Sequence, residues 1–208
     1  MKNKIFLSFL IVFGLQIFST FSQDKKGLAR VTKIQGVEAY FLSEPLREYD
    51  VVFDEGTGLK VTSILTGGLV NESVSDKATQ FVERVVKEGK EQGKSFDAVI
   101  YTSGKKVIAV KFKTEGTDTN KGIGRVKKIS GMDIFVLSEP LSDYDVVNQK
   151  GGGLKLKSAL TGGVVNNSIE EDVEQFANRL KKDAEDDGKT VEAIVYSAGK
   201  SAIGAKYK

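Results

Sequence analysis

The stretch FLSEPLREYDVV occupies residues 41–52, and VLSEPLSDYDVV occupies residues 136–147. The two segments lie 95 residues apart and are identical at nine of twelve positions. The agreement continues on both sides, because residues 30–113 align with residues 125–208 without a gap and 39 of these 84 positions are identical. Such self-similarity predicts a duplicated unit, in which residue n of the first copy is equivalent to residue n + 95 of the second.

The N-terminus has the pattern of a secretory signal peptide. A basic start, Met-Lys-Asn-Lys, is followed by an apolar run over 5–18 and by small residues at Thr20 and Ser22. The apolar run is shorter than the roughly 20 residues that span a bilayer. We therefore expect residues 1–22 to be a signal peptide cleaved after Ser22, and the protein to be exported to the periplasm or exterior of a bacterial cell. The alternative is an uncleaved N-terminal anchor.

The composition excludes several kinds of chemistry. The chain contains no cysteine and no histidine, which excludes disulfides, Ser-His-Asp and Cys-His catalysis and the usual zinc sites. Removal of the signal takes away Lys2 and Lys4, so that the net charge falls from +3 to +1. Nucleic-acid binding normally requires a clustered cationic excess. We expect no nucleic-acid partner, no cofactor and no stable membrane insertion after cleavage.

Each copy begins with a pattern typical of a β-hairpin. ARVTKI and VEAYFL (29–34 and 37–42) flank Gln35-Gly36, and the second copy has Ser130-Gly131 at the same place. The SEPL segment is predicted to be a turn, because Pro45 and Pro140 have no N–H to donate to a strand ladder. YDVV is then predicted to be a short strand.

The rest of each copy predicts a strand, a helix and two strands. LKVTSIL (59–65) and LKLKSAL (154–160) alternate with period two. Apolar residues at helical spacing then form one stripe in each copy, and Gly93 and Gly188 follow where a helix would end. The stripes are Val74, Ala78, Phe81, Val82 and Val85, and Ile169, Val173, Phe176, Ala177 and Leu180.

These patterns predict an α+β fold with two tandem copies of a mostly antiparallel sheet, in the order β-β-β-β-α-β-β with one helix packed on one face. The first domain is expected over residues 29–113, and the second over residues 124–208. TEGTDTNKGI (114–123) is polar and glycine-containing, and is predicted to be a linker. Since 84 residues bury only a limited core, we expect the copies to pack together through a pseudo-twofold interface.

The order of these elements resembles that of small bacterial α+β families described as heavy-metal-binding or of unknown function, some of which assemble as rings. The resemblance covers each copy, and consists of an apolar strand, a proline-containing turn, Tyr-Asp-Val-Val, a strand, a helix and an EAIVY-like strand. It implies an α+β unit, and transfers no functional residue to this chain.

The SEPL–YD segments supply the candidate ligand-binding residues Glu44, Tyr49, Asp50, Glu139, Tyr144 and Asp145. Paired carboxylates near a turn could bind a divalent cation or serve as a general acid and base. The alternative is that the acids cap turns while the tyrosines pack. Asn71 and Asn166 begin N-x-[ST] sequons, which are also compatible with capping of the following helix.

Three functions follow from these features. The first is a non-catalytic exported protein whose repeats bind a partner or assemble into a complex. The second is a carrier or sensor of a small ligand or divalent cation that uses the SEPL–YD carboxylates. The third is a carboxylate-based hydrolase. The absence of a catalytic constellation favours the first, and we expect the protein not to be an enzyme.

Overall fold

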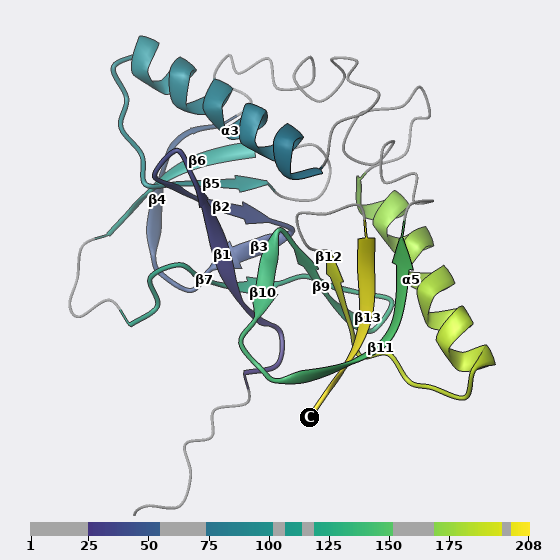
Figure 1. Ribbon diagram of the computed structural model, residues 1–208. Helices are drawn as coiled ribbons and strands as arrows, with labels where there is room; N and C mark the ends of the chain where they lie inside the picture. Colours follow the sequence, from purple (N-terminus) through teal and green to yellow (C-terminus); the bar gives the residue numbers. More distant parts are fainter. Residues whose placement is uncertain (1–24, 55–73, 102–106, 114–118, 152–168, 197–200) are drawn as a thin grey trace, which may run out of the picture.

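The computed structural model of the chain describes residues 25–54, 74–101, 107–113, 119–151, 169–196 and 201–208. These residues form a mixed structure of strands with two helices, α3 (Val74–Glu91) and α5 (Ile169–Asp186), as shown in Figure 1. The first half contains β1 (Leu28–Ile34), β2 (Val37–Phe41), β3 (Ser43–Pro45), β4 (Tyr49–Asp54), β5 (Ala98–Tyr101) and β6 (Val107–Phe112). The second half contains β7 (Ile123–Val126), β8 (Lys128–Ile129), β9 (Met132–Val136), β10 (Ser138–Pro140), β11 (Tyr144–Gly151), β12 (Ala193–Tyr196) and β13 (Ser201–Tyr207).

The described strands of the two halves follow the same order. The first half has the order β1-β2-β5-β6-β4, and the second has the order β8-β9-β12-β13-β11. Neighbouring strands are antiparallel except for β2–β5 and β9–β12, which are parallel. A helix lies between the two strands of each parallel pair along the chain, and such a crossover is what a parallel pairing requires.

The two predicted hairpins are confirmed. Ile34 pairs with Val37, and Ile129 pairs with Met132, so that each loop has two residues. The loop residues Gln35 and Gly36 have φ of 53° and 80°. Positive φ at both positions is characteristic of the type I′ turn, whose twist matches that of the flanking strands.

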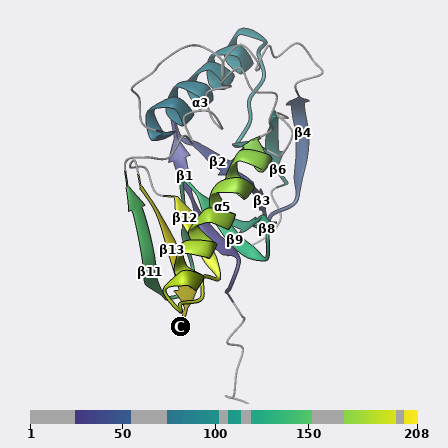
Figure 2. The ribbon, with the colours of Figure 1, turned by 90° about the vertical axis from the view of Figure 1, so that its right-hand side faces the viewer.

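Each helix packs on its sheet through those members of the predicted stripe whose side chains the structure describes. Phe81, Val82 and Val85 of α3 are at most 2% exposed, and Ala177 and Leu180 of α5 are fully buried. Figure 2 shows α5 lying against the strands of the second half, with α3 at the other end of the molecule. Among the described residues, no helix is long and apolar enough to cross a membrane.

The inner strands of both sheets are buried on both faces. Every residue of β2, β5, β9 and β12 is buried. The helices cover one face, while the opposite faces form two further apolar clusters around Tyr40 and Phe135. Both clusters include side chains of β1 or β7, such as Val31 and Val126. Burial on both faces explains why these strands are apolar at every position except Glu38 and Asp133.

The SEPL segment forms a short strand in each copy, and the predicted turn is therefore wrong. Leu42 and Leu137 precede these strands with φ of 48° and 50°, a conformation that is uncommon for leucine. The left-handed residue redirects the chain, so that β3 pairs with β7 and β10 pairs with β1. Each strand ends at its proline, which edge positions tolerate.

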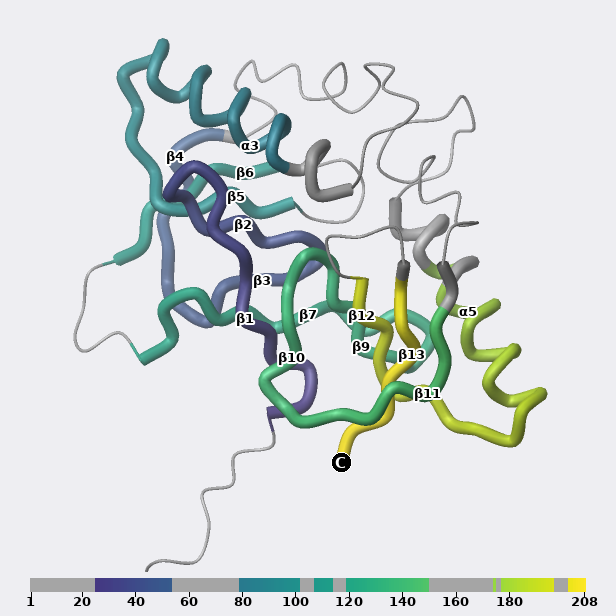
Figure 3. Tube along the Cα trace, viewed as in Figure 1, coloured from purple at the N-terminus to yellow at the C-terminus, as the bar shows by residue number. Residues whose placement is uncertain are grey.

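The pairings of β1 with β7 and β10, and of β7 with β3, join the two halves. Residues that are equivalent at the 95-residue offset take part in equivalent pairings. Ala29 of β1 lies opposite Gly124 of β7, and these two residues are 95 positions apart. Arg30 faces Glu139 on one side of the pair, and Arg125 faces Glu44 on the other. Figure 3 shows β1 running between the strands of the two halves. The ranges predicted as separate domains are therefore joined by shared β-structure.

Several predictions concern segments outside the described residues. They are the signal peptide at 1–22, the strands at 59–65 and 154–160, and the sequons at Asn71 and Asn166. The predicted linker 114–123 is described only from residue 119, and its last residue, Ile123, already begins β7.

The shared strands predict that half of the chain will not fold alone. Residues 119–208 without the first half leave β7 and β10 without β1, and expose the apolar cluster that contains Val126. We expect this fragment to show no cooperative unfolding transition, or to associate with itself. Circular dichroism and sedimentation will test this against the chain from residue 23 onward. A monomeric fragment as stable as that chain would contradict the expectation.

Candidate functional site

The carboxylates of the SEPL–YD segments do not converge. Asp50 and Asp145 are exposed, and their carboxylates lie 3.8 Å from Lys113 Nζ and 3.2 Å from Lys208 Nζ, respectively. Glu44 and Glu139 are exposed on β3 and β10. In the described part of the chain, no three acidic side chains are grouped as metal ligands.

Tyr49 and Tyr144 are half-buried and pack against the apolar clusters on the faces opposite the helices. Burial raises the pKa of Tyr49, and the nearby charge of Glu44 raises it further. Asp50 follows Tyr49 directly in β4, so its side chain points to the opposite face. The structure therefore brings Glu44 close to Tyr49 and places Asp50 on the other face of β4.

Two of the predicted site residues, Glu139 and Tyr144, line a groove between the two halves. Its volume is about 990 Å³. One wall comes from β1 and Thr79 of α3, and the other from β10 to β13, whose positions are visible in Figure 1. The lining residues are Arg30, Val31, Thr32, Lys33, Ile34, Gln35, Thr79, Leu137, Ser138, Glu139, Pro140, Tyr144, Val195 and Ile203.

Some polar groups in this groove are already engaged, whereas the hydroxyl of Ser138 is not. The Thr32 hydroxyl donates to the Leu137 carbonyl at 2.8 Å, and the Gln35 amide donates to Glu83 Oε1 at 2.8 Å. Ser138 is only 6% exposed, and its hydroxyl has no hydrogen-bond partner in the structure. A buried hydroxyl without a partner costs about 1–3 kcal/mol. Ser138 is therefore a position where a ligand could supply a missing hydrogen bond.

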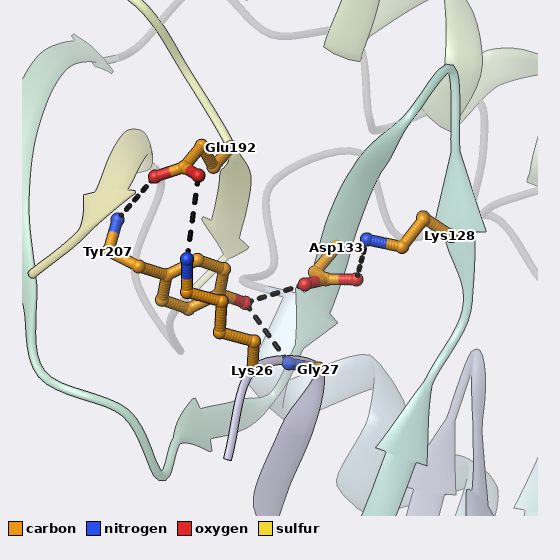
Figure 4. Close-up of polar contacts among 6 residues, drawn as sticks. All are labelled: Lys26, Gly27, Lys128, Asp133, Glu192 and Tyr207. Carbon is orange, nitrogen blue, oxygen red and sulfur yellow. Dashed lines mark hydrogen bonds and ion pairs between the residues drawn. The ribbon is translucent and has the colours of Figure 1, made fainter. Parts of the chain in front are cut away.

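A second polar cluster surrounds the buried Asp133, as shown in Figure 4. Its carboxylate accepts a 2.8 Å hydrogen bond from the Tyr207 hydroxyl and lies 3.0 Å from Lys128 Nζ. The Gly27 N–H donates to the same hydroxyl at 3.3 Å. The cluster thus connects the beginning of the first half to the last strand of the second.

The first half buries an acid at the equivalent position with different partners. Glu38 accepts a 2.8 Å hydrogen bond from the Tyr40 hydroxyl and forms an ion pair with Arg47. The Arg47 guanidinium also stacks on the Phe112 ring, 3.4 Å from its centroid. Phenylalanine and tyrosine have exchanged places between the copies, since Tyr40 is equivalent to Phe135 and Phe112 to Tyr207.

Both phenols are held in the neutral form. Burial raises the pKa of Tyr207, and its hydrogen bond to Asp133 raises it further. Burial likewise raises the pKa of Tyr40, followed by the hydrogen bond to Glu38. Each phenol therefore serves as a permanent hydrogen-bond donor to a buried carboxylate near neutral pH.

The sequence-based interpretation missed both the Ser138 groove and the buried acids. The acids had a visible signal, because Glu38 and Asp133 each stand at the same position of an otherwise apolar strand. Charged residues in such runs are rarely buried without a partner. The groove had no such signal, since it depends on how β1 and β10 meet.

Removal of the Tyr207 hydroxyl will leave Asp133 without its only described hydroxyl donor. We expect Tyr207→Phe to lower the free energy of unfolding by about 1–3 kcal/mol. Tyr144→Phe is the matched control, because this tyrosine is half-buried on the neighbouring strand and its hydroxyl forms no hydrogen bond with the other described residues. Urea denaturation at pH 7 measures both, and equal stability of the two variants would argue against the role of the cluster.

The raised tyrosine pKa values also predict a loss of stability in alkali. The unfolded chain ionises its tyrosines near the ordinary pKa of 10.0, whereas the folded chain resists ionisation. The stabilising contribution is thus complete below pH 10 and is lost as the pH rises further, at up to about 1.4 kcal/mol per pH unit for each such group. Urea denaturation between pH 9 and 11 should show a shallower decline for Tyr207→Phe than for the unmodified chain, and parallel declines would refute this.

No family model, curated protein or solved structure matches the chain.

Proposed function

We propose that this chain is an exported, non-catalytic binding protein that takes a small ligand in the groove between its two halves. The observation that carries the proposal is Ser138, a residue that lines the groove and whose buried hydroxyl has no hydrogen-bond partner among the described residues. Native structures pair nearly all such groups, so an unpaired one calls for an explanation. A bound ligand provides it.

The size and lining of the groove support a small ligand. Ligand sites typically enclose about 300–1,000 Å³ and combine apolar walls with a few polar groups that orient the ligand. Here the apolar contribution includes Val31, Val195 and Ile203, and the polar one includes Ser138 and Lys33. The site is formed only when the halves are joined, which ties binding to the two-copy organisation of the chain.

A second candidate function, docking of a protein partner, is favoured by a different observation. Val51 of β4 and Val146 of β11 are 55% and 57% exposed and lie at equivalent positions of the two copies. Two like contact points could engage a partner through avidity. They are single exposed residues, however, and surfaces commonly carry such residues without a function. The groove is therefore a stronger basis for a proposed function than the exposed residues Val51 and Val146.

The cation-carrier and hydrolase hypotheses receive less support. Both need carboxylates that face one another across a site. Asp50 and Asp145 instead pair with surface lysines, and no three acidic residues of the described part of the chain are grouped as metal ligands. The proposal that the protein is exported depends only on the signal-peptide pattern of residues 1–22.

Ligand binding can be detected as thermal stabilisation of the chain from residue 23 onward. A ligand at 100 times its dissociation constant adds roughly 2.7 kcal/mol to the free energy of unfolding. The panel should contain organic acids, alcohols, sugars, phosphate and divalent cations. We expect at least one organic compound to raise the melting temperature.

The variant Ile203→Trp fills the groove and should abolish that shift. Ile108→Trp is the matched control, because Ile108 is the equivalent residue of the first half and does not line the groove. Circular dichroism will establish that both variants are folded. A shift that survives in Ile203→Trp would place the ligand elsewhere and contradict the proposal.

A further inference from the structure

The two buried acids differ in the cation that neutralises them, and the difference changes the groove. In the second half, Asp133 lies directly opposite Lys128 in the strand pairing and forms its ion pair with that lysine. In the first half, Glu38 lies directly opposite Lys33, the equivalent lysine, yet pairs with Arg47. Serine occupies position 142, the equivalent of Arg47, in the second half.

Arg47 therefore leaves Lys33 available. Lys33 is exposed, lines the groove and forms no ion pair in the described part of the chain. An ammonium group beside a partly enclosed apolar wall attracts a negatively charged ligand group. This is the feature that separates Lys33 from Lys128, whose ammonium is already paired.

Ser138 lies on the same side of the strands as Lys33. Val31 of β1 is directly opposite Ser138 of β10, and Lys33 is two residues beyond Val31. Side chains two residues apart in a strand point to the same face. An anion between Lys33 and Ser138 would receive an ammonium donor and a hydroxyl donor, and would supply the acceptor that Ser138 lacks.

Apolar side chains continue the groove beyond this polar corner. Tyr144, Val195 and Ile203 belong to the apolar cluster of the second half and line the groove together. They can bury a hydrocarbon body of the ligand, at roughly 25 cal/mol for each Å² removed from water.

We propose that the groove binds an amphipathic carboxylate, with its anionic end between Lys33 and Ser138 and its apolar body against Tyr144, Val195 and Ile203. This inference rests on the proposed function and adds the chemical class of the ligand. It also assigns a role to Arg47, which does not line the groove. By pairing with Glu38, Arg47 keeps Lys33 available and acts as a positioning residue.

The equivalent place in the first half lacks this capacity. Ser43 is 4% exposed, and its hydroxyl has no partner in the structure, as for Ser138. The lysine equivalent to Lys33 is Lys128, which is held by Asp133. We therefore infer one carboxylate site in each chain, although the two halves resemble each other.

The probes that test the ligand class are decanoate, acetate and 1-decanol. Isothermal titration with the chain from residue 23 onward should give one decanoate bound per chain and much weaker binding of the other two, because each lacks either the charge or the hydrocarbon body. The peptide acetyl-Val-Leu-Leu carries the same chemistry from a second source. Tight binding of either decanoate or the peptide supports the amphipathic carboxylate as the ligand class. Whichever of the two binds more tightly identifies whether the ligand is a free carboxylic acid or a peptide.

Charge and hydroxyl variants test the two anchoring groups. Lys33→Ala and Ser138→Ala should each weaken binding of the tighter probe, by roughly 10-fold to 100-fold for the charged contact and about 5-fold or more for the hydroxyl. Lys121→Ala removes an exposed lysine outside the groove, and Ser43→Ala removes the equivalent hydroxyl. Both controls should bind as the unmodified chain does.

The role of Arg47 has its own test. Arg47→Ser should weaken binding about 10-fold, because Lys33 then pairs with Glu38. Arg47→Ser combined with Glu38→Gln removes the competing acid and should restore binding. A merely structural role of Arg47 predicts no such rescue, so failure of the double variant to bind would overturn the assignment of Arg47.

The outcomes separate the two proposals. Binding that is lost in Ile203→Trp but unchanged in Lys33→Ala and Ser138→Ala would preserve the proposed function and overturn the carboxylate site. Binding of 1-decanol as tight as that of decanoate would do the same. If none of the probes binds while another compound of the panel binds in the groove, the ligand class is wrong. If no compound binds in the groove, both proposals fail.

Discussion

The rest of the structure depends on the antiparallel pairing of β1 with β7 around Ala29 and Gly124. This pairing brings the first strands of the two halves together, and each of them then accepts the short SEP strand of the other half. Gly124 is required by close packing, since a Cβ there would lie 3.0 Å from both the Tyr40 ring and the Glu44 carbonyl oxygen. The approach of the strands thus limits which side chains the centre can hold.

The buried acids show how two similar halves solve one problem differently. A carboxylate removed from water needs a hydrogen-bond donor and a cation. Glu38 obtains its phenol from Tyr40 on the same strand, and Asp133 obtains its phenol from Tyr207 on the last strand. The choice of Arg47 or Lys128 as the cation then decides which lysine remains available at the groove. A structural requirement of the core therefore shapes the chemistry of the surface beside it.

Elements with strong local signals were predicted well. The two-residue hairpins follow from Gln35-Gly36 and Ser130-Gly131. Each helix follows from one apolar stripe, and ends just before Gly93 or Gly188. The SEP strands were predicted as turns, because proline has no N–H to donate to a strand ladder. No local sequence pattern shows that the other residues of these segments pair with β1 or β7. The candidate residues Glu139 and Tyr144 do line the groove, whereas Asp50 and Asp145 form ion pairs with lysines at the surface.

By itself, the sequence determined the repeat, the hairpins, the helices and the exclusion of histidine and cysteine chemistry. The hairpins and helices depend on spacing within a few turns of the chain, the repeat depends on residue identity at a constant offset of 95, and the excluded chemistry depends on composition alone. Only the tertiary structure decided that the halves share strands, that both faces of the inner strands are buried, and that Ser138 and Lys33 meet in one groove. Those features arise from pairing between residues about 100 positions apart, such as Val31 with Ser138. The pairing depends on the left-handed turn at Leu137 and on the fit around Gly124, which no local sequence pattern encodes.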